Sequence, residues 1–263
     1  MALYNVRLLT NAQRARIDVV LVSPRNPLNI GATARAMVNF GFAQLSVVAP
    51  FEAHWREAKS AVGAPELLAS AREFPSLAEA VAECTYVMGT GTLTHRKAQQ
   101  PVILLPDLAP TLDSALDSGG RVALVFGPEK HGLTRDDLAF CHALVTIPTE
   151  PTQPSMNLGQ AVAVCLYELT RAHAERLDER SDRTKLANTP ESPTSGALDR
   201  MADLIEQTME RSGYSPRIME AANRHDLRLL LRRLQWSEAD ARRALGLFRR
   251  VLWRIQRSGR KRQ

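Results

Sequence analysis

Polar residues follow the first hydrophobic segment of the chain, at the point where a strand would be followed by a helix. Residues 24–35 read Pro-Arg-Asn-Pro-Leu-Asn-Ile-Gly-Ala-Thr-Ala-Arg. Asn29 has a side chain suited to a helix N-cap, and Gly31 permits close approach of another backbone. Arg35 falls in the first turns of the expected helix. There it would contact an anion bound at the strand ends, or face solvent as an ordinary surface arginine.

Two further polar loops have the same place relative to hydrophobic segments. Residues 126–133 read Phe-Gly-Pro-Glu-Lys-His-Gly-Leu, and two glycines bracket Glu129. Backbone amides and one carboxylate would line a pocket there. Residues 147–157 contain three prolines, which reduce the entropy lost when a loop is ordered. Each loop alone is a weak signal, but three of them together predict one shared site.

The elements that must position these loops alternate between strand-like and helix-like patterns. Residues 16–22 are rich in Val, Ile and Leu and end at Ser-Pro, as expected of a buried strand. This alternation indicates an α/β fold, with a mostly parallel sheet covered on both faces. Ligands bind beyond the carboxyl ends of such strands, where the three loops begin. The other predicted strands are 45–48, 86–89, 122–126 and 144–147, and the predicted helices are 29–40, 65–71, 77–84, 111–118, 134–140 and 157–177.

The last part of the chain has a different organisation. Residues 180–197 are polar, contain two prolines and lack an apolar period, which predicts a linker. Helices are expected over 198–211 and 217–234, and Ser237 is the predicted N-cap of a last helix. One apolar stripe runs along that helix, and most of its arginines fall outside the stripe. The stripe comprises Ala241, Ala244, Leu245, Phe248, Val251, Leu252 and Ile255, and the arginines are Arg243, Arg250, Arg254 and Arg257.

The positive charge of the protein is concentrated in this tail. Residues 200–263 hold 15 arginines and one lysine against seven acidic residues, a net charge of +9, whereas the preceding residues have a net charge of −3. Arginine suits phosphate groups and nucleotide faces, so the pattern indicates a polyanion such as RNA or DNA as partner. The alternative is a solvated arginine-rich helix face. Trp236 and Trp253 are expected to pack within the tail, with base stacking as their alternative role.

Several classes of protein are excluded by composition. No apolar run approaches the roughly 18–20 residues that span a bilayer, and the first residues lack the apolar core of a signal peptide. The three cysteines, Cys84, Cys141 and Cys165, are odd in number and widely spaced, which fits a reducing compartment rather than a disulfide framework. The six histidines show no metal-ligand spacing, so no metal site is expected. We therefore expect a cytoplasmic globular protein.

The three loops together resemble the motifs of the TrmH-type branch of the SPOUT RNA methyltransferases. That branch has an Asn…Gly…Arg segment, a Phe-Gly-x-Glu…Gly-Leu loop and an Ile-Pro…Ser-Leu-Asn loop. Here these motifs read Asn29…Gly31…Arg35, residues 126–133, and Ile147-Pro…Ser-Met-Asn157. Methionine in place of leucine at position 156 is a nearly isosteric change. The resemblance covers residues 16–175 and, with the basic tail, is strongest to the bacterial TrmJ subgroup.

This resemblance implies a fold, a cofactor and a set of site residues. The fold would be a parallel-sheet SPOUT domain with a deep C-terminal trefoil knot, a rare exception to unknotted topology, plus a small all-α extension. The cofactor would be S-adenosyl-L-methionine, with S-adenosyl-L-homocysteine as product. The residues implied to bind it are Thr90, Gly91, Thr92, Gly127, Ile147, Pro154, Ser155 and Met156. The residues implied for catalysis or for holding the catalytic geometry are Arg35, Ser155, Asn29, Glu129 and Asn157.

The resemblance also implies a substrate and partners. The subgroup 2′-O-methylates tRNA at position 32 of the anticodon loop, preferably on cytidine or uridine, and the family acts as a homodimer. Residues 1–178 would be the methyltransferase domain, 179–197 the linker and 198–263 a basic RNA-binding extension. Two alternatives stay open: methylation of ribosomal RNA or another tRNA site, and a knotted RNA-binding protein without catalysis.

Overall fold

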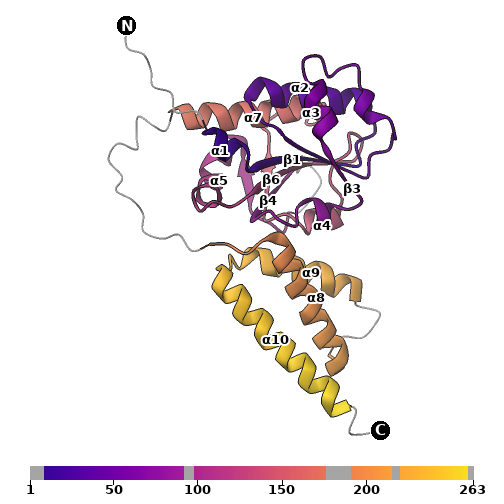
Figure 1. The fold of residues 1–263 in the computed structure, drawn as a ribbon, viewed down its shortest axis with the longest axis vertical. Helices are drawn as coiled ribbons and strands as arrows, with labels where there is room; N and C mark the ends of the chain where they lie inside the picture. Colours follow the sequence, from indigo (N-terminus) through magenta and orange to yellow (C-terminus); the bar gives the residue numbers. More distant parts are fainter. Residues whose placement is uncertain (1–8, 92–97, 176–190, 215–219, 260–263) are drawn as a thin grey trace.

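The computed structural model describes residues 9–91, 98–175, 191–214 and 220–259, and its centre is a parallel sheet of seven strands (Figure 1). The strand order is β3-β2-β1-β6-β4-β7-β5, and all neighbouring strands in this order pair in parallel. The strands are β1 Ile17–Val22, β2 Gln44–Val48, β3 Arg72–Phe74, β4 Tyr86–Thr90, β5 Val102–Leu104, β6 Val122–Phe126 and β7 Ala143–Thr146. The predicted parallel α/β architecture is therefore confirmed.

Helices cover both faces of the sheet because successive strand side chains point to opposite sides. One hydrophobic core packs α2 (Pro27–Phe40), α3 (Pro65–Ser70), α5 (Leu108–Asp117) and α7 (Leu158–Glu175) against one face. A second core packs α4 (Leu77–Ala80) and the segment around α6 (Arg135–Leu138) against the other face. The short helices α1 (Asn11–Arg14), η1 (Trp55–Glu57) and η2 (Leu105–Asp107) complete the domain.

The sequence misplaced some elements of this domain. The edge strands β3 and β5 were not predicted, because each has only three residues and lacks a long hydrophobic run. Helix α4 ends at Ala80, four residues before the expected end, and α6 is shorter than the expected 134–140. The predicted N-cap of α2 is wrong. Asn26 caps the helix by accepting a hydrogen bond from the amide of Leu28 at 2.9 Å, with Pro27 in the first helical position.

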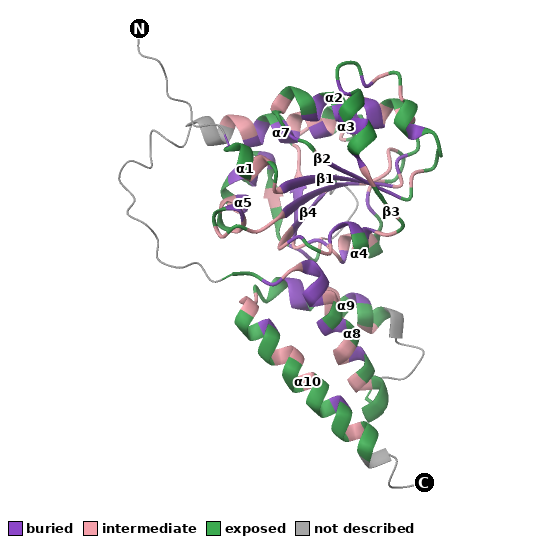
Figure 2. Ribbon diagram, viewed as in Figure 1, coloured by how far each residue is buried: buried purple, intermediate pink, exposed green. Residues whose placement is uncertain are grey.

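The described residues after position 190 contain three helices, which are α8 (Ser195–Ser212), α9 (Glu220–Arg233) and α10 (Glu238–Gly259). They share their own small core around Leu198, Met201 and Leu231. Helix α8 begins three residues earlier than predicted, with Thr194 as its N-cap. Ser237 accepts a hydrogen bond from the amide of Asp240, as its predicted capping role requires. Figure 2 shows that α10 exposes most of its length.

A buried arginine joins the three helices to the sheet domain. Arg232 of α9 is 3% exposed and donates hydrogen bonds to the carbonyl of Phe140, to the Ser195 hydroxyl and to Asp199. The amide of Ser195 also donates to the carbonyl of Cys84 at 2.7 Å. Phe140 lies just beyond α6, which follows the second motif loop, so the tail contacts the sheet domain next to that loop.

Candidate functional site

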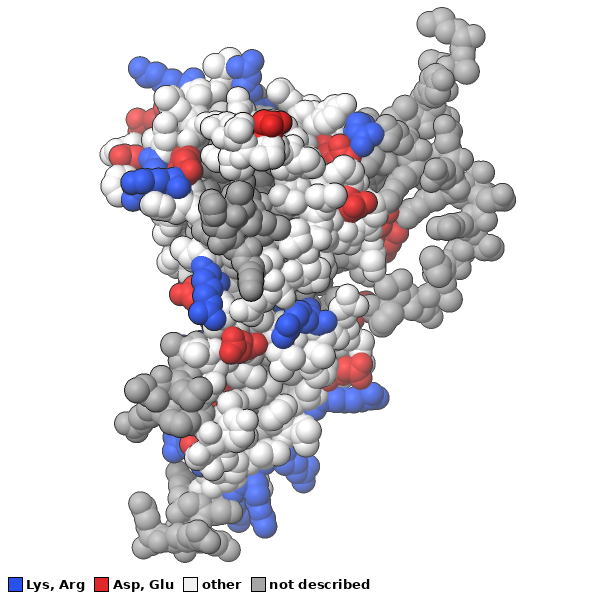
Figure 3. All heavy atoms as spheres, turned by 180° about the vertical axis from the view of Figure 1, so that it is seen from behind, with Lys and Arg blue, Asp and Glu red and all other residues white. Residues whose placement is uncertain are grey.

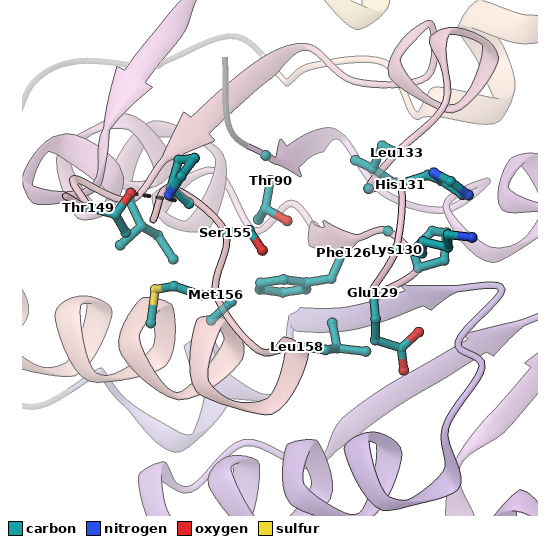
Figure 4. A pocket seen from close by; sticks show the side chains of 17 residues that line it. Thr90, Phe126, Glu129, Lys130, His131, Leu133, Thr149, Ser155, Met156 and Leu158 are labelled. Carbon is teal, nitrogen blue, oxygen red and sulfur yellow. Dashed lines mark hydrogen bonds between the residues drawn. The ribbon is translucent and has the colours of Figure 1, made fainter. Parts of the chain in front are cut away.

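A pocket of about 240 Å³ lies at the carboxyl ends of the central strands (Figure 4). Its walls come from the ends of β4 and β6, from the loop after β6, from the loop after β7 and from the start of α7. In Figure 4 the side chains of Thr90, Phe126 and Ser155 surround the hollow. The residues lining it are Thr90, Gly91, Phe126, Gly127, Pro128, Glu129, Lys130, His131, Gly132, Leu133, Ile147, Thr149, Pro154, Ser155, Met156, Leu158 and Ala161.

The carboxylate of Glu129 connects the pocket to the first motif loop. It accepts hydrogen bonds from the backbone amides of Arg25 and Asn26, at 3.1 and 3.2 Å, and from the Asn29 side chain at 2.7 Å. In Figure 4 this carboxylate is turned away from Ser155. Glu129 therefore fixes the loop between β1 and α2 against the wall of the pocket.

Asn157 adds the third motif to the same network. Its side-chain amide donates to the Asn29 side-chain oxygen at 2.9 Å, while its own oxygen accepts from the amide of Gly159 at 3.0 Å. Asn157 thus caps α7, and Asn29 is held between Asn157 and Glu129. We call Asn29, Glu129 and Asn157 the motif junction, because they join three loops that are about 30 and 100 residues apart in the sequence.

The junction stabilises the ionised form of Glu129. Partial burial acts to raise the pKa of this carboxyl group, but hydrogen bonds from Asn29 and from backbone amides outweigh burial and lower the pKa below its ordinary value. Glu129 is accordingly ionised at neutral pH and is suited to holding the loops rather than to donating a proton.

Glycine is required where the second loop folds back on itself. A Cβ atom on Gly127 would lie 2.2 Å from the amide nitrogen of Leu133 and 2.3 Å from the carbonyl carbon of Gly132. Real Cβ atoms do not come this close to backbone, so any other residue would force the loop to open. The third loop is also tightly folded, because the Thr149 hydroxyl donates a hydrogen bond across it to the carbonyl of Pro154 at 3.1 Å. Two of the walls of the pocket are thus tightly folded loops.

Most of the residues implied by the family resemblance meet at this site. Seven of the eight implied cofactor contacts line the pocket, and the eighth, Thr92, lies outside the described residues. Glu129 and Ser155 line it as well, and Asn29 and Asn157 join its wall through the junction. Arg35 differs, since it is exposed on α2 and is absent from the pocket lining. In the single chain, Arg35 is not assembled with the other predicted residues.

Sequence reasoning missed several residues of the pocket. Phe126 and Leu133 were read only as the ends of a motif, and Leu158 and Ala161 only as helix residues, yet they supply apolar surface to the cavity. Their place at the carboxyl ends of β6 and at the start of α7 was the available signal. The backbone amides that bind Glu129 carry no signal in the sequence.

Cysteines and possible metal ligands are the next candidates for reactive chemistry among the described residues. Cys84, Cys141 and Cys165 are free and buried, and burial raises the pKa of each thiol to about 12. Within the described ranges, no group of three or more His, Cys, Asp or Glu side chains could hold a metal ion. No described helix is both long and apolar enough to cross a membrane.

The surface of the tail is basic. Figure 3 shows Lys and Arg side chains gathered along the lower, helical part of the molecule, whereas both signs of charge mix over the sheet domain. Trp253 is 51% exposed, so the expectation that it packs inside the tail is wrong. The Arg257 guanidinium lies 5.0 Å from the centroid of its indole ring. The exposed arginines of α10 are Arg242, Arg243, Arg249, Arg250, Arg254 and Arg257.

The fold and the pocket together define a parallel α/β protein with a pocket at the carboxyl edge of its sheet, where folds of this class bind their ligands. The model of the SpoU rRNA Methylase family matches residues 16–167, and the chain belongs to that family.

Relatives extend the similarity beyond this domain. A protein of Pseudomonas aeruginosa named tRNA (cytidine/uridine/adenosine-2′-O-)-methyltransferase TrmJ is 34% identical, over 93% of this chain and 95% of its own length. The crystal structure of TrmJ from Z. mobilis superposes with a TM-score of 0.75 at 32% identity, covering 90% of this chain and 99% of that chain. A probable methylase from Haemophilus influenzae gives a TM-score of 0.58 at 28% identity, over 93% and 99% of the two chains.

Proposed function

We propose that this protein is an S-adenosyl-L-methionine-dependent methyltransferase that 2′-O-methylates a ribose in tRNA. The observation that carries the proposal is the motif junction beside the pocket, which joins the three loops expected of such an enzyme. Relatives that match more than nine-tenths of the chain and are named for tRNA 2′-O-methylation support the same substrate. From the motif resemblance we further propose cytidine or uridine at position 32 of the anticodon loop as the target.

The pocket suits the proposed cofactor. Its volume of about 240 Å³ is slightly below the roughly 300–1,000 Å³ typical of small-molecule sites, so a nucleoside cofactor would fill it and reach its mouth. Phe126, Ile147 and Leu158 offer apolar surface to a purine ring, and the tightly folded loops present backbone groups around it. Gly127 keeps the second loop in the shape that leaves this space open.

The residues of this chain would position the reactants. When bound, S-adenosyl-L-methionine would supply a methyl group attached to a positively charged sulfur. The ribose 2′-oxygen would bond to the methyl carbon as the carbon–sulfur bond breaks, so that S-adenosyl-L-homocysteine leaves and the 2′-hydroxyl proton passes to solvent. We assign to Arg35 the orientation of the 2′-hydroxyl and the stabilisation of its developing negative charge, because a charged guanidinium is a poor base. Ser155 lies at the pocket, where its hydroxyl would hydrogen-bond to Arg35 in the assembled site.

Arg35 reaches such a position most simply in a homodimer. It is exposed on α2, and the neighbouring surface of α2 and α7 exposes apolar side chains, among them Val38 (45%) and Tyr167 (52%). We propose that this surface pairs with a second copy, so that each pocket is completed by the partner's α2. Sedimentation would test this pairing, and a monomer at micromolar concentration would contradict it.

The remaining expectations about architecture form part of the same proposal. The close packing of the loops after β6 and β7 around the start of α7 supports a trefoil knot in that region. The separate core of the three C-terminal helices supports division into a methyltransferase domain (1–178), a linker (179–197) and a basic extension (198–263) that binds RNA, with the start of the extension moved to Ser195, where α8 begins. Residues 179–190, most of the proposed linker, lie outside the described residues. A tRNA substrate supports the expected cytoplasmic location.

Methyl transfer from labelled S-adenosyl-L-methionine to bulk unmethylated tRNA tests the function, with Arg35→Ala and Arg35→Lys beside the wild type. We expect a 2′-O-methylated pyrimidine in the anticodon loop, loss of activity in Arg35→Ala and little recovery in Arg35→Lys, which keeps the charge without the planar fork. The family description names ribosomal RNA, so transfer to ribosomal RNA alone would replace tRNA as substrate. Binding of both ligands without transfer to any RNA would favour a non-catalytic RNA-binding protein.

A further inference from the structure

The cofactor pocket occupies only part of the carboxyl edge of the sheet. Its loops follow β4, β6 and β7, which lie on one side of β1 in the strand order. The loops that follow β1 and β2 form the adjoining part of the edge, and they contain two exposed side chains of complementary chemistry. Phe51 is 70% exposed, and the guanidinium carbon of Arg25 lies 5.4 Å from the centroid of its ring.

This arginine–aromatic pair is connected directly to the pocket wall. The backbone amide of Arg25 donates to Glu129 at 3.1 Å, while the amide of Phe51 donates to the carbonyl of Pro24 at 3.1 Å. The two loops are therefore joined to each other and to the motif junction. The pair therefore lies on loops that are fixed to the wall of the pocket at Glu129.

The backbone is strained at the two positions that bring the loops together. Ser23 and Ala49 have φ angles of +44° and +41°, in the left-handed region that residues other than glycine rarely adopt. They follow the last residues of β1 and β2, and the amide of Ser23 donates to the carbonyl of Val48 at 2.8 Å. Strain of this kind persists where the surrounding structure holds it, and it is typical of functional sites.

Because the Phe51 ring is mostly exposed, it buries little apolar surface and contributes little to the stability of the fold. At Trp55, by contrast, the ring under Arg56 is completely buried and contributes to the core. Proteins that recognise unpaired RNA commonly stack its bases on aromatic rings or on arginine planes. We propose that Arg25 and Phe51 form a stacking site for an unpaired nucleobase of the RNA substrate, placed so that the attached ribose faces the pocket. This proposal rests on the RNA substrate of the proposed function.

Direct RNA binding tests the proposal separately from catalysis. The affinity of labelled tRNA would be measured by fluorescence anisotropy with saturating S-adenosyl-L-homocysteine, for the wild type, Phe51→Ala, Phe51→Leu and Phe51→Trp. Val62→Ala, which truncates a similarly exposed (65%) apolar side chain in the following segment, is the matched control. Because base stacking on an aromatic ring typically contributes about 5- to 150-fold in affinity, we expect about tenfold weaker binding for the alanine and leucine variants. Phe51→Trp and Val62→Ala should bind like the wild type, with cofactor affinity unchanged throughout.

Three outcomes would overturn the stacking site. The first is that Phe51→Ala binds tRNA as tightly as the wild type. The second is that Phe51→Trp loses as much affinity as Phe51→Ala. The third is that Phe51→Ala changes the sedimentation of the protein, which would assign the ring to contact with a second copy. A wild type that binds tRNA in this way but transfers no methyl group would contradict the proposed function alone.

Discussion

The sheet domain and the C-terminal helices differ in how their polar side chains are arranged. In the sheet domain, Asn29, Glu129 and Asn157 come from three distant segments and satisfy one another through hydrogen bonds of 2.7 and 2.9 Å. In the tail, six exposed arginines are spread along a single helix, α10. The first arrangement depends on the exact position of each group, and the second on the density of charge. We therefore expect single changes to disable the first and only to weaken the second.

The largest effect is expected where the two regions meet. Arg232→Ala would leave the Ser195 hydroxyl and the carbonyl of Phe140 without their buried partner, and Asp199 would keep the more distant Arg228, at 3.6 Å. Breaking a buried pair of this kind typically costs about 3–5 kcal/mol. Urea unfolding would measure this loss in the free energy of unfolding. Arg233→Ala, which changes the neighbouring exposed arginine, is the control. An equal loss in both variants would mean that Arg232 contributes no specific contact between the regions.

Loss of the motif junction should reduce activity without unfolding the protein. Glu129→Ala removes the acceptor for two backbone amides and for Asn29, so the loop before α2 loses its position relative to the pocket. Displacements of about 1 Å in such sites cost roughly 100-fold in rate, and we expect a fall of that size in kcat. Glu150→Ala, which removes an exposed carboxylate from the third loop, is the control. Unchanged kcat in Glu129→Ala would contradict the positioning role.

A partly buried histidine makes the boundary between the sheet domain and the C-terminal helices sensitive to acid. Burial lowers the pKa of His142 to about 3, with the charge of Arg232 acting in the same direction, and its Nδ1 accepts a hydrogen bond from the amide of Val87. Since the pKa is near 6.5 in the unfolded chain, this depression penalises folding only below that pH. At pH 5 the loss is about 2 kcal/mol. His142→Gln should remove this loss of stability between pH 7 and pH 5. Urea unfolding at several pH values would measure the free energy of unfolding of both proteins. The same dependence on pH in the wild type and the variant would contradict the role of His142.

The two regions also differed in what their sequences disclosed. The strands β1 and β6 could be predicted because runs of Val, Leu and Phe are stable only when buried. The basic character of the tail could be predicted from its count of arginines. The role of Asn29 could not be predicted, because nothing in the sequence distinguishes a capping asparagine from one that bridges two loops. Asn26 is the N-cap of α2, and the Asn29 side chain instead donates a hydrogen bond to Glu129. Contacts between residues 100 positions apart depend on the strand order, which local patterns do not specify.

The smallest effect is expected from neutralising part of the basic surface of α10. Arg249 and Arg250 are exposed and have no ion-pair partner among the residues that the structure describes, so they are available to phosphate groups. Their joint replacement by glutamine should weaken tRNA binding several-fold and reduce the slope of log affinity against log salt by about 1.5, since each phosphate contact contributes about 0.7–0.9. Gln256→Ala, an uncharged change on the same helix, should leave both quantities unchanged. If the double variant keeps the wild-type salt slope, α10 does not contact the RNA backbone, and the positive charge of the tail would instead be a solvated face.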